Sequence, residues 1–224
     1  MNFFQGILEV FEKVDLMKGL GETLFMIIVS TVIAYGFGLP LGIIVTITDR
    51  HGLTPHPILH RILGWIINMT RSIPYIILLV ALIPFTLWLI GTSVGPKAVV
   101  VSLSIAAIPF VGRVVETSLK EIDRGVVEAA ICMGASPWVI ITKVYLVEAI
   151  PSLIRGISLT MIMLVGYSAM AGAVGGGGLG DIAIRYGFYR FDTNVMLVTL
   201  VVLIILVQIT QIIFDVIAKK INRK

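Results

Sequence analysis

The chain has 224 residues, of which 58% are hydrophobic and 13% are charged, and its mean hydropathy is +1.03. Soluble domains contain roughly 45–50% apolar and about 25% charged residues, so this composition excludes a soluble protein and indicates an integral membrane protein. The net charge of +4 requires no nucleic-acid partner, because the charge asymmetry that orients membrane spans accounts for it.

Residues 1–22 predict a short amphipathic helix on the membrane surface. Apolar side chains recur there at helical spacing, at Phe4, Ile7, Leu8, Phe11 and Val14. Acidic residues precede the first long apolar run, whereas a cleavable signal peptide opens with a basic region. We therefore expect this segment to be retained.

Five segments are long and apolar enough to span a bilayer, which takes about 20 residues. They are 23–46, 66–90, 98–115, 153–174 and 195–218. The predicted fold is all-α, a polytopic membrane protein formed by a single domain over 1–224. In the first span, Gly38 and Gly42 form a small-xxx-small pair, which predicts close approach of another helix.

Basic residues are unevenly divided between the two sides of these spans. One side carries only Lys13, Lys18, Lys97, Arg185 and Arg190. The other side carries Arg50, Arg61, Arg71, Arg113, Lys120, Arg124, Lys143, Arg155, Lys219, Lys220, Arg223 and Lys224. The positive-inside rule then places the N-terminus outside and the C-terminus in the cytoplasm.

The loop after the first span holds His51 and His56, with His60 just beyond. His56 and His60 have the spacing of a helical zinc pair, but Pro55 and Pro57 flank His56 and disfavour a regular helix there. No metal site is predicted.

Arg71 lies inside the second apolar segment, with Pro74 and Pro84 after it. A cation at this depth marks a functional site, unless its guanidinium reaches the headgroups by snorkelling. Both interpretations remain open.

Residues 116–151 form a charged segment between two apolar runs, and we expect it in the cytoplasm as a helix-turn-helix. Good helix formers follow Arg124, and Gly134 suits a left-handed C-terminal cap. Ser136 and Pro137 then supply an N-cap and a proline at the first helical position.

The same segment carries a family resemblance. Glu128, Ala129, Ala130 and Gly134 resemble the EAA motif of ABC importer permeases, which docks on the ATPase partner. The proline that ends this motif is replaced by Val147. The strings RSIPYIILLVALIPFT and LVGYSAMAGAVGGGGLGDIAIRYGF are similar to the permeases of methionine ABC importers.

The fourth span combines small and flexible side chains, and in a permease dimer it is the expected pathway lining. The residues are Met161, Met163, Gly166, Ser168 and Met170, and Arg71 is a further candidate for the pathway. For the methionines, lipid or core packing is the alternative.

A run of glycines follows this span and contains a G-x-G-x-x-G pattern. It does not indicate a dinucleotide site, because such a site follows a strand within a βαβ unit and this pattern follows a membrane span. There is also no G-x-x-x-x-G-K-[ST], so we expect neither ATP binding, nor a cofactor, nor enzymatic activity in this chain. The next loop holds Asp181, Arg185, Tyr189 and Arg190, interpreted either as a binding-protein docking surface or as an interfacial belt.

The resemblance implies a multi-pass permease of the bacterial inner membrane that imports L- or D-methionine by alternating access. It implies a homodimer, two cytoplasmic ATPase subunits holding ATP and Mg, and an extracytoplasmic methionine-binding protein. The alternatives are the same machine with another small amino acid or amine as cargo and, from another class, a stand-alone secondary transporter or channel. The near absence of charges at the span centres disfavours the second alternative.

Overall fold

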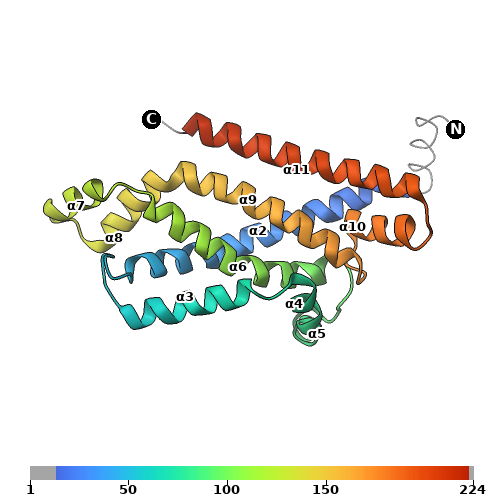
Figure 1. Ribbon diagram of the computed structural model, residues 1–224, viewed down its shortest axis with the longest axis horizontal. Helices are drawn as coiled ribbons and strands as arrows, with labels where there is room; N and C mark the ends of the chain where they lie inside the picture. Colours follow the sequence, from blue (N-terminus) through green and yellow to red (C-terminus); the bar gives the residue numbers. More distant parts are fainter. Residues whose placement is uncertain (1–13, 222–224) are drawn as a thin grey trace. The chain divides into compact units, whose positions relative to one another are not determined.

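The computed structural model describes residues 14–221, and all of its regular elements within that range are helical (Figure 1). The first thirteen residues of the amphipathic helix expected over 1–22 lie outside this range. Most of the remaining residues of that predicted segment belong to α2 (Leu16–Ile47), which begins at Leu16 rather than at the predicted start of the first span, residue 23.

Within the described residues, nine further α-helices follow α2. They are α3 (Pro57–Arg71), α4 (Tyr75–Ala81), α5 (Ile83–Ile90), α6 (Pro96–Lys120), α7 (Arg124–Cys132), α8 (Pro137–Val139), α9 (Leu146–Gly172), α10 (Gly178–Ile182) and α11 (Thr193–Ile221). Two π-helical turns, η1 (Ile140–Tyr145) and η2 (Ala183–Phe188), follow α8 and α10 respectively. Within residues 14–221, four helices are long and apolar enough to cross a membrane, and α3 with α4 provides a fifth, broken candidate.

The apolar segment predicted over 66–90 is not one continuous helix, because it is divided among α3, α4 and α5. α3 ends at Arg71, and the Ser72 N–H still bonds the carbonyl oxygens of Asn68 and Met69 at 3.1 Å. Pro74 then disfavours helical geometry at Ile73 and has no N–H to continue the ladder. The break therefore follows from local proline chemistry.

Both ends of the charged segment predicted over 116–151 belong to the long helices that flank it. α6 extends to Lys120, and the helix that contains α9 starts at Pro137, so the elbow between them is shorter than the sequence suggested.

The chain divides into two compact units. The first contains the described residues up to Val32, Pro74–Ala106 and Met161–Gln211. The second contains Ile33–Ile73, Ala107–Thr160 and the described residues from Ile212 onward. The helices α2, α6, α9 and α11 contribute residues to both units.

The first unit is built around the glycine run before α10. Its core packs Val14, Leu16, Leu179, Ile182 and Val195 from α10 and the starts of α2 and α11. These three elements are drawn in blue, orange and red in Figure 1.

Residues on α2 hold the backbone of this run. Glu22 Oε2 accepts the Gly178 N–H at 2.7 Å, and Thr23 Oγ1 accepts the Leu179 N–H at 2.9 Å. Gly177 and Gly178 have φ of 79° and 75°, a conformation that only glycine adopts without strain. The glycines therefore make a tight turn, as expected from the sequence.

In the second unit, α2 and α6 approach closely at the predicted glycine pair. A methyl group at Gly38 would lie 2.7 Å from the Val111 side chain, and one at Gly42 would lie 2.6 Å from Val115. No ordinary contact is that short, so both positions require glycine. This confirms that the pair permits close helix packing.

Candidate functional site

The elbow of the second unit consists of α7, a glycine turn and the start of α8. The Asp123 side chain caps α7 by accepting the Gly125 N–H at 2.7 Å. Gly134 has φ of 80°, and the Ala135 N–H bonds the Ala130 carbonyl at 3.1 Å across the turn. Ser136 Oγ then caps α8, where Pro137 takes the first position. The predicted helix, left-handed glycine and capped second helix are all observed.

The four residues of the EAA-like motif differ in exposure. Glu128, Ala129 and Gly134 are exposed, whereas Ala130 is 5% exposed. The elbow therefore exposes three motif residues to its surroundings and buries the fourth.

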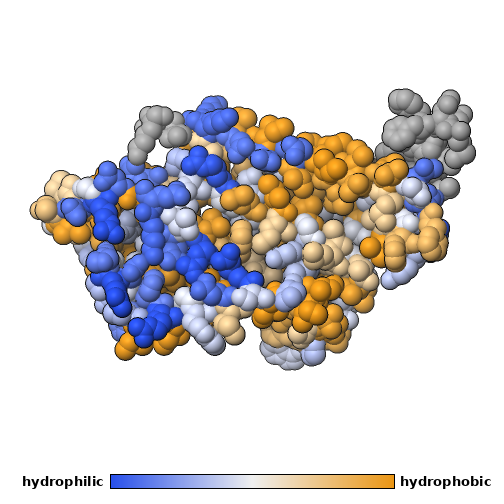
Figure 2. Space-filling view, in the orientation of Figure 1, coloured by the Kyte–Doolittle hydropathy of each residue, from blue (hydrophilic) through white to orange (hydrophobic). Residues whose placement is uncertain are grey.

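Large apolar side chains at the tip of the elbow were missed by sequence reasoning. Met133 is 81% exposed and Trp138 is 72% exposed, and Ile131 is exposed as well. Figure 2 shows hydrophilic residues gathered over the second unit near the end of α6 and the start of α9. Apolar residues inside a charged segment were the available signal, since solvated turns rarely expose a Trp and a Met together.

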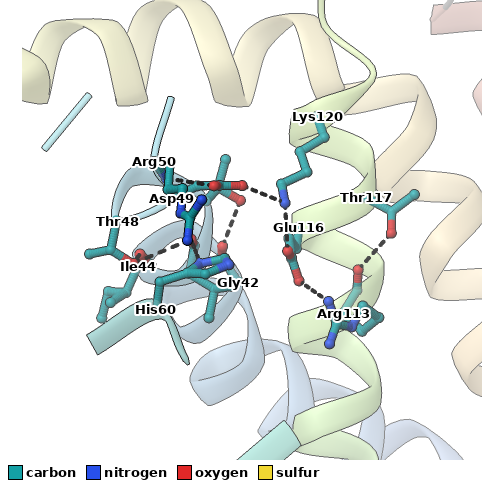
Figure 3. Close-up of polar contacts among 12 residues, drawn as sticks. Gly42, Ile44, Thr48, Asp49, Arg50, His60, Arg113, Glu116, Thr117 and Lys120 are labelled. Atoms are coloured by element: carbon teal, nitrogen blue, oxygen red, sulfur yellow. Dashed lines mark hydrogen bonds and ion pairs between the residues drawn. The ribbon is translucent and has the colours of Figure 1, made fainter. Parts of the chain in front are cut away.

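An ion-pair network joins the last turns of α6 to the loop that follows α2 (Figure 3). Lys120 Nζ is 2.7 Å from Asp49 Oδ2 and 2.9 Å from Glu116 Oε1. Arg113 donates to the other oxygen of Glu116 at 2.6 Å and to Asn68 Oδ1 at 2.7 Å. The hydrogen bond from Lys120 lowers the pKa of Asp49. These contacts neutralise Glu116, whose side chain is only 4% exposed.

A cavity of about 540 Å³ lies between α7, the loop after α2 and the end of α6. Glu128 and Arg124 line it together with Asp49 and Lys120. The exposed glutamate of the elbow and the ion-pair network thus border the same cavity.

The predicted pathway residues are divided between the two units. Met161, Met163, Gly166, Ser168 and Met170 all lie on the part of α9 that belongs to the first unit, and Arg71 belongs to the second. Gly166 is exposed and Met170 is 50% exposed. Ser168 is buried and donates to the Val165 carbonyl at 2.8 Å.

Arg71 is exposed at the end of α3, with its guanidinium carbon 5.8 Å from the centroid of the Phe110 ring. A cavity of about 360 Å³ adjoins it, lined also by Arg113, Glu121 and Arg155. The sequence did not associate these residues, because they come from α3, from α6 with the turn after it, and from α9.

The predicted docking residues lie on α10, η2 and the turn that follows. Asp181 and Arg185 form an ion pair, and this hydrogen bond raises the pKa of the arginine. The Arg190 guanidinium stands 4.6 Å from the Tyr186 ring centroid. Tyr189 is 66% exposed, and the neighbouring Phe191, missed by sequence reasoning, is 87% exposed with φ of 56°.

Comparisons with known proteins agree with this arrangement. The chain is 46% identical over 209 residues to the probable D-methionine transport system permease protein MetI of Vibrio cholerae serotype O1, covering 93% of each chain. It is 44% identical over 203 residues to the protein of the same name from Pasteurella multocida, covering 91% of this chain and 94% of the relative.

A solved structure of the MetNI methionine ABC transporter, described as inward facing, matches with a TM-score of 0.92 and 45% identity. The match covers 93% of this chain and 96% of the solved one. Residues 38–223 match the family described as "Binding-protein-dependent transport system inner membrane component". The chain therefore belongs to this family of binding-protein-dependent transport system inner membrane components.

Proposed function

We propose that this chain is the permease subunit of an ABC importer that moves methionine across the bacterial inner membrane by alternating access. The similarity to the MetNI transporter carries the proposal, because a TM-score of 0.92 and 45% identity extend over 93% of the chain. A homodimer would bind two cytoplasmic ATPase subunits and an extracytoplasmic methionine-binding protein. Hydrolysis of ATP with Mg would take place on the ATPase subunits.

The proposed topology places the N-terminus outside and the elbow and C-terminus in the cytoplasm. The uneven distribution of Lys and Arg supports this orientation. Aromatic residues of the opposite loop, including Tyr189 and Phe191, then face the side from which a binding protein arrives. We assign docking of that protein to this loop, with Asp181, Arg185 and Arg190 at its charged positions.

The elbow is the proposed contact with the ATPase. Glu128 offers a charge, Ala129 permits close seating, and the exposed Met133 and Trp138 supply apolar anchors of the kind that dominate binding energy at interfaces. Ala130 is assigned to internal packing, since it is buried. Because α7 is joined to α8 by a short capped turn, it would transmit motion as a lever to α9.

The pathway is assigned to the first-unit part of α9 and to Arg71. Gly166 leaves open space beside the helix, since no atom lies within 4 Å of where its Cβ would be. Met170 is half exposed and offers a polarizable thioether to a passing substrate.

Reconstitution in proteoliposomes tests the function. The chain would be co-expressed with its ATPase and supplied with the binding protein, and uptake of radiolabelled L- and D-methionine would be measured with and without ATP. We expect ATP-dependent methionine uptake that requires all three components. Uptake by this chain alone, without the ATPase, would contradict the proposal, and uptake of a different amino acid or amine would contradict the assigned cargo.

A further inference from the structure

The second unit contains a small cavity whose chemistry the coupling function does not use. It measures about 360 Å³, within the roughly 300–1,000 Å³ of small-molecule sites. The cavity is bordered by the end of α3, by α6 and by the first half of α9. Its lining comprises Arg71, Phe110, Arg113, Val114, Thr117, Ser118, Glu121, Ser152, Arg155, Gly156 and Leu159.

Two guanidinium groups at this cavity lack a carboxylate partner among residues 14–221. Arg113 is engaged with Glu116 and Asn68, at 2.6 and 2.7 Å. No hydrogen bond or ion pair joins the side chains of Arg71 and Arg155 to another residue within 14–221, and Arg71 stacks only against Phe110. Each retains a planar set of donors that matches a carboxylate or phosphate.

The carboxylate of Glu121 lines the same cavity and can accept a further hydrogen bond. Glu121 Oε2 accepts from Ser152 Oγ at 3.2 Å, and Ser152 Oγ is also 2.9 Å from Ser118 Oγ. These hydroxyls fix one oxygen of Glu121, while Oε1 has no partner among the described residues. That oxygen can accept a hydrogen bond from an ammonium group.

One part of the lining is apolar. Phe110, Val114 and Leu159 provide it, from two different helices. The cavity thus combines two cationic side chains, one anionic acceptor and a hydrophobic wall, which is the complement of a zwitterionic amino acid with an apolar side chain.

We propose that this cavity is an amino-acid site, at which cargo is held before release into the cytoplasm. Arg71 and Arg155 bind the α-carboxylate, Glu121 Oε1 binds the α-ammonium, and the side chain lies on Phe110, Val114 and Leu159. That the amino acid is methionine rests on the proposed function. Glu121 distinguishes this ligand from an anionic lipid such as phosphatidylglycerol, because a carboxylate repels the phosphate and that headgroup carries no cationic group to compensate it.

Equilibrium binding of radiolabelled L-methionine to the permease–ATPase complex, without binding protein, tests the site. The complex would be held in nanodiscs of phosphatidylcholine, and binding to the isolated ATPase would be subtracted. We expect Arg71→Gln and Arg155→Gln each to weaken binding by about tenfold, the effect of losing one charge-assisted hydrogen bond. Arg61→Gln is the matched control, since Arg61 is exposed on α3 but does not line this cavity.

Ligand analogues make the test independent of variant folding. With the unmodified complex, 3-(methylthio)propylamine, which lacks the carboxylate, and 4-(methylthio)butanoate, which lacks the ammonium, should each compete about tenfold less well than methionine. The penalty for the missing carboxylate should vanish in the Arg71→Gln/Arg155→Gln variant. The penalty for the missing ammonium should vanish in Glu121→Gln.

Equal binding by the unmodified complex and both arginine variants would overturn the proposal. So would binding of phosphatidylglycerol in place of methionine, detected by adding that lipid to the nanodiscs. Uptake by the full importer is measured in parallel. If methionine is imported while the variants bind it normally, only the site is wrong; if another amino acid is imported, the function is wrong and the binding series is repeated with that amino acid.

Discussion

The ammonium of Lys120 lies 2.7 Å from Asp49 Oδ2, joining the last turn of α6 to the loop that follows α2 (Figure 3). The same nitrogen is 2.9 Å from Glu116, so one lysine bridges an exposed loop and a buried carboxylate. The loop also borders the cavity beneath α7. This bridge therefore ties the region that supports the elbow to the membrane helices of the second unit.

The bridge gives a pH-dependent contribution to stability. The hydrogen bond from Lys120 lowers the pKa of Asp49 below its ordinary value of 3.8, so the stabilisation is complete above that value and is lost as the pH falls through the lowered pKa. Because both side chains are partly exposed, we expect Asp49→Asn to destabilise by about 0.5–1 kcal/mol at pH 7. Unfolding midpoints measured between pH 7 and pH 3 would check this. A difference between the two proteins that stays constant with pH would contradict it.

Glu116 should be the most sensitive carboxylate of the network. Its side chain is 4% exposed, and Glu116→Ala would leave Arg113 and Lys120 without their shared partner. We expect a loss of about 3 kcal/mol, at the lower end for a broken buried pair because water still reaches both cations. Thermal unfolding in detergent measures the loss. Asp215→Ala, on α11 and outside the network, is the control and should shift the midpoint much less.

Two substitutions in the elbow should separate coupling from folding. Gly134→Asp places a side chain where φ is 80°, at a cost of about 1–2 kcal/mol confined to the turn. Glu128→Arg reverses the charge that we propose the elbow offers to the ATPase. We expect both to reduce methionine uptake about tenfold or more, equivalent to about 1.4 kcal/mol of lost coupling, while the membrane dimer stays folded.

Co-purification of the ATPase and uptake per ATP hydrolysed measure that effect. Gly64→Ala is the matched glycine control, because Gly64 lies within α3 and nothing stands within 4 Å of its Cβ position. Uptake at the unmodified rate by both elbow variants would rule out the elbow as the ATPase contact.

The contact between α9 and α10 should tolerate no added methyl group. A Cβ at Gly180 would lie 2.5 Å from the Cα of Ala169, and one at Gly172 would meet the backbone of Gly180 and Asp181. Gly180→Ala should therefore destabilise by about 1–3 kcal/mol through overpacking. Gly36→Ala, where the space is open, serves as the control in the same thermal assay. Equal midpoints for the two variants would show that α10 can shift without loss.

Much of the elbow could be predicted because its determinants are adjacent in sequence. Asp123, Gly134 and Ser136 each act on backbone groups within five residues, so capping rules suffice to place them. Burial within the elbow was not predictable in this way. Ala129 and Ala130 are the same residue type, so the sequence does not distinguish them. Only the packing of α7 buries Ala130 and leaves Ala129 exposed.

The sequence by itself determined the all-helical membrane class, the glycine contacts of α2 and the turn of the elbow. Hydrophobic length and local backbone chemistry are sufficient for these. Only the tertiary structure decided that Asp49 meets Lys120, that Glu22 holds Gly178, and that Arg71 shares a cavity with Arg155. Each of these pairs joins residues far apart in the chain, and the direction in which their side chains point is set by helix packing rather than by neighbouring residues.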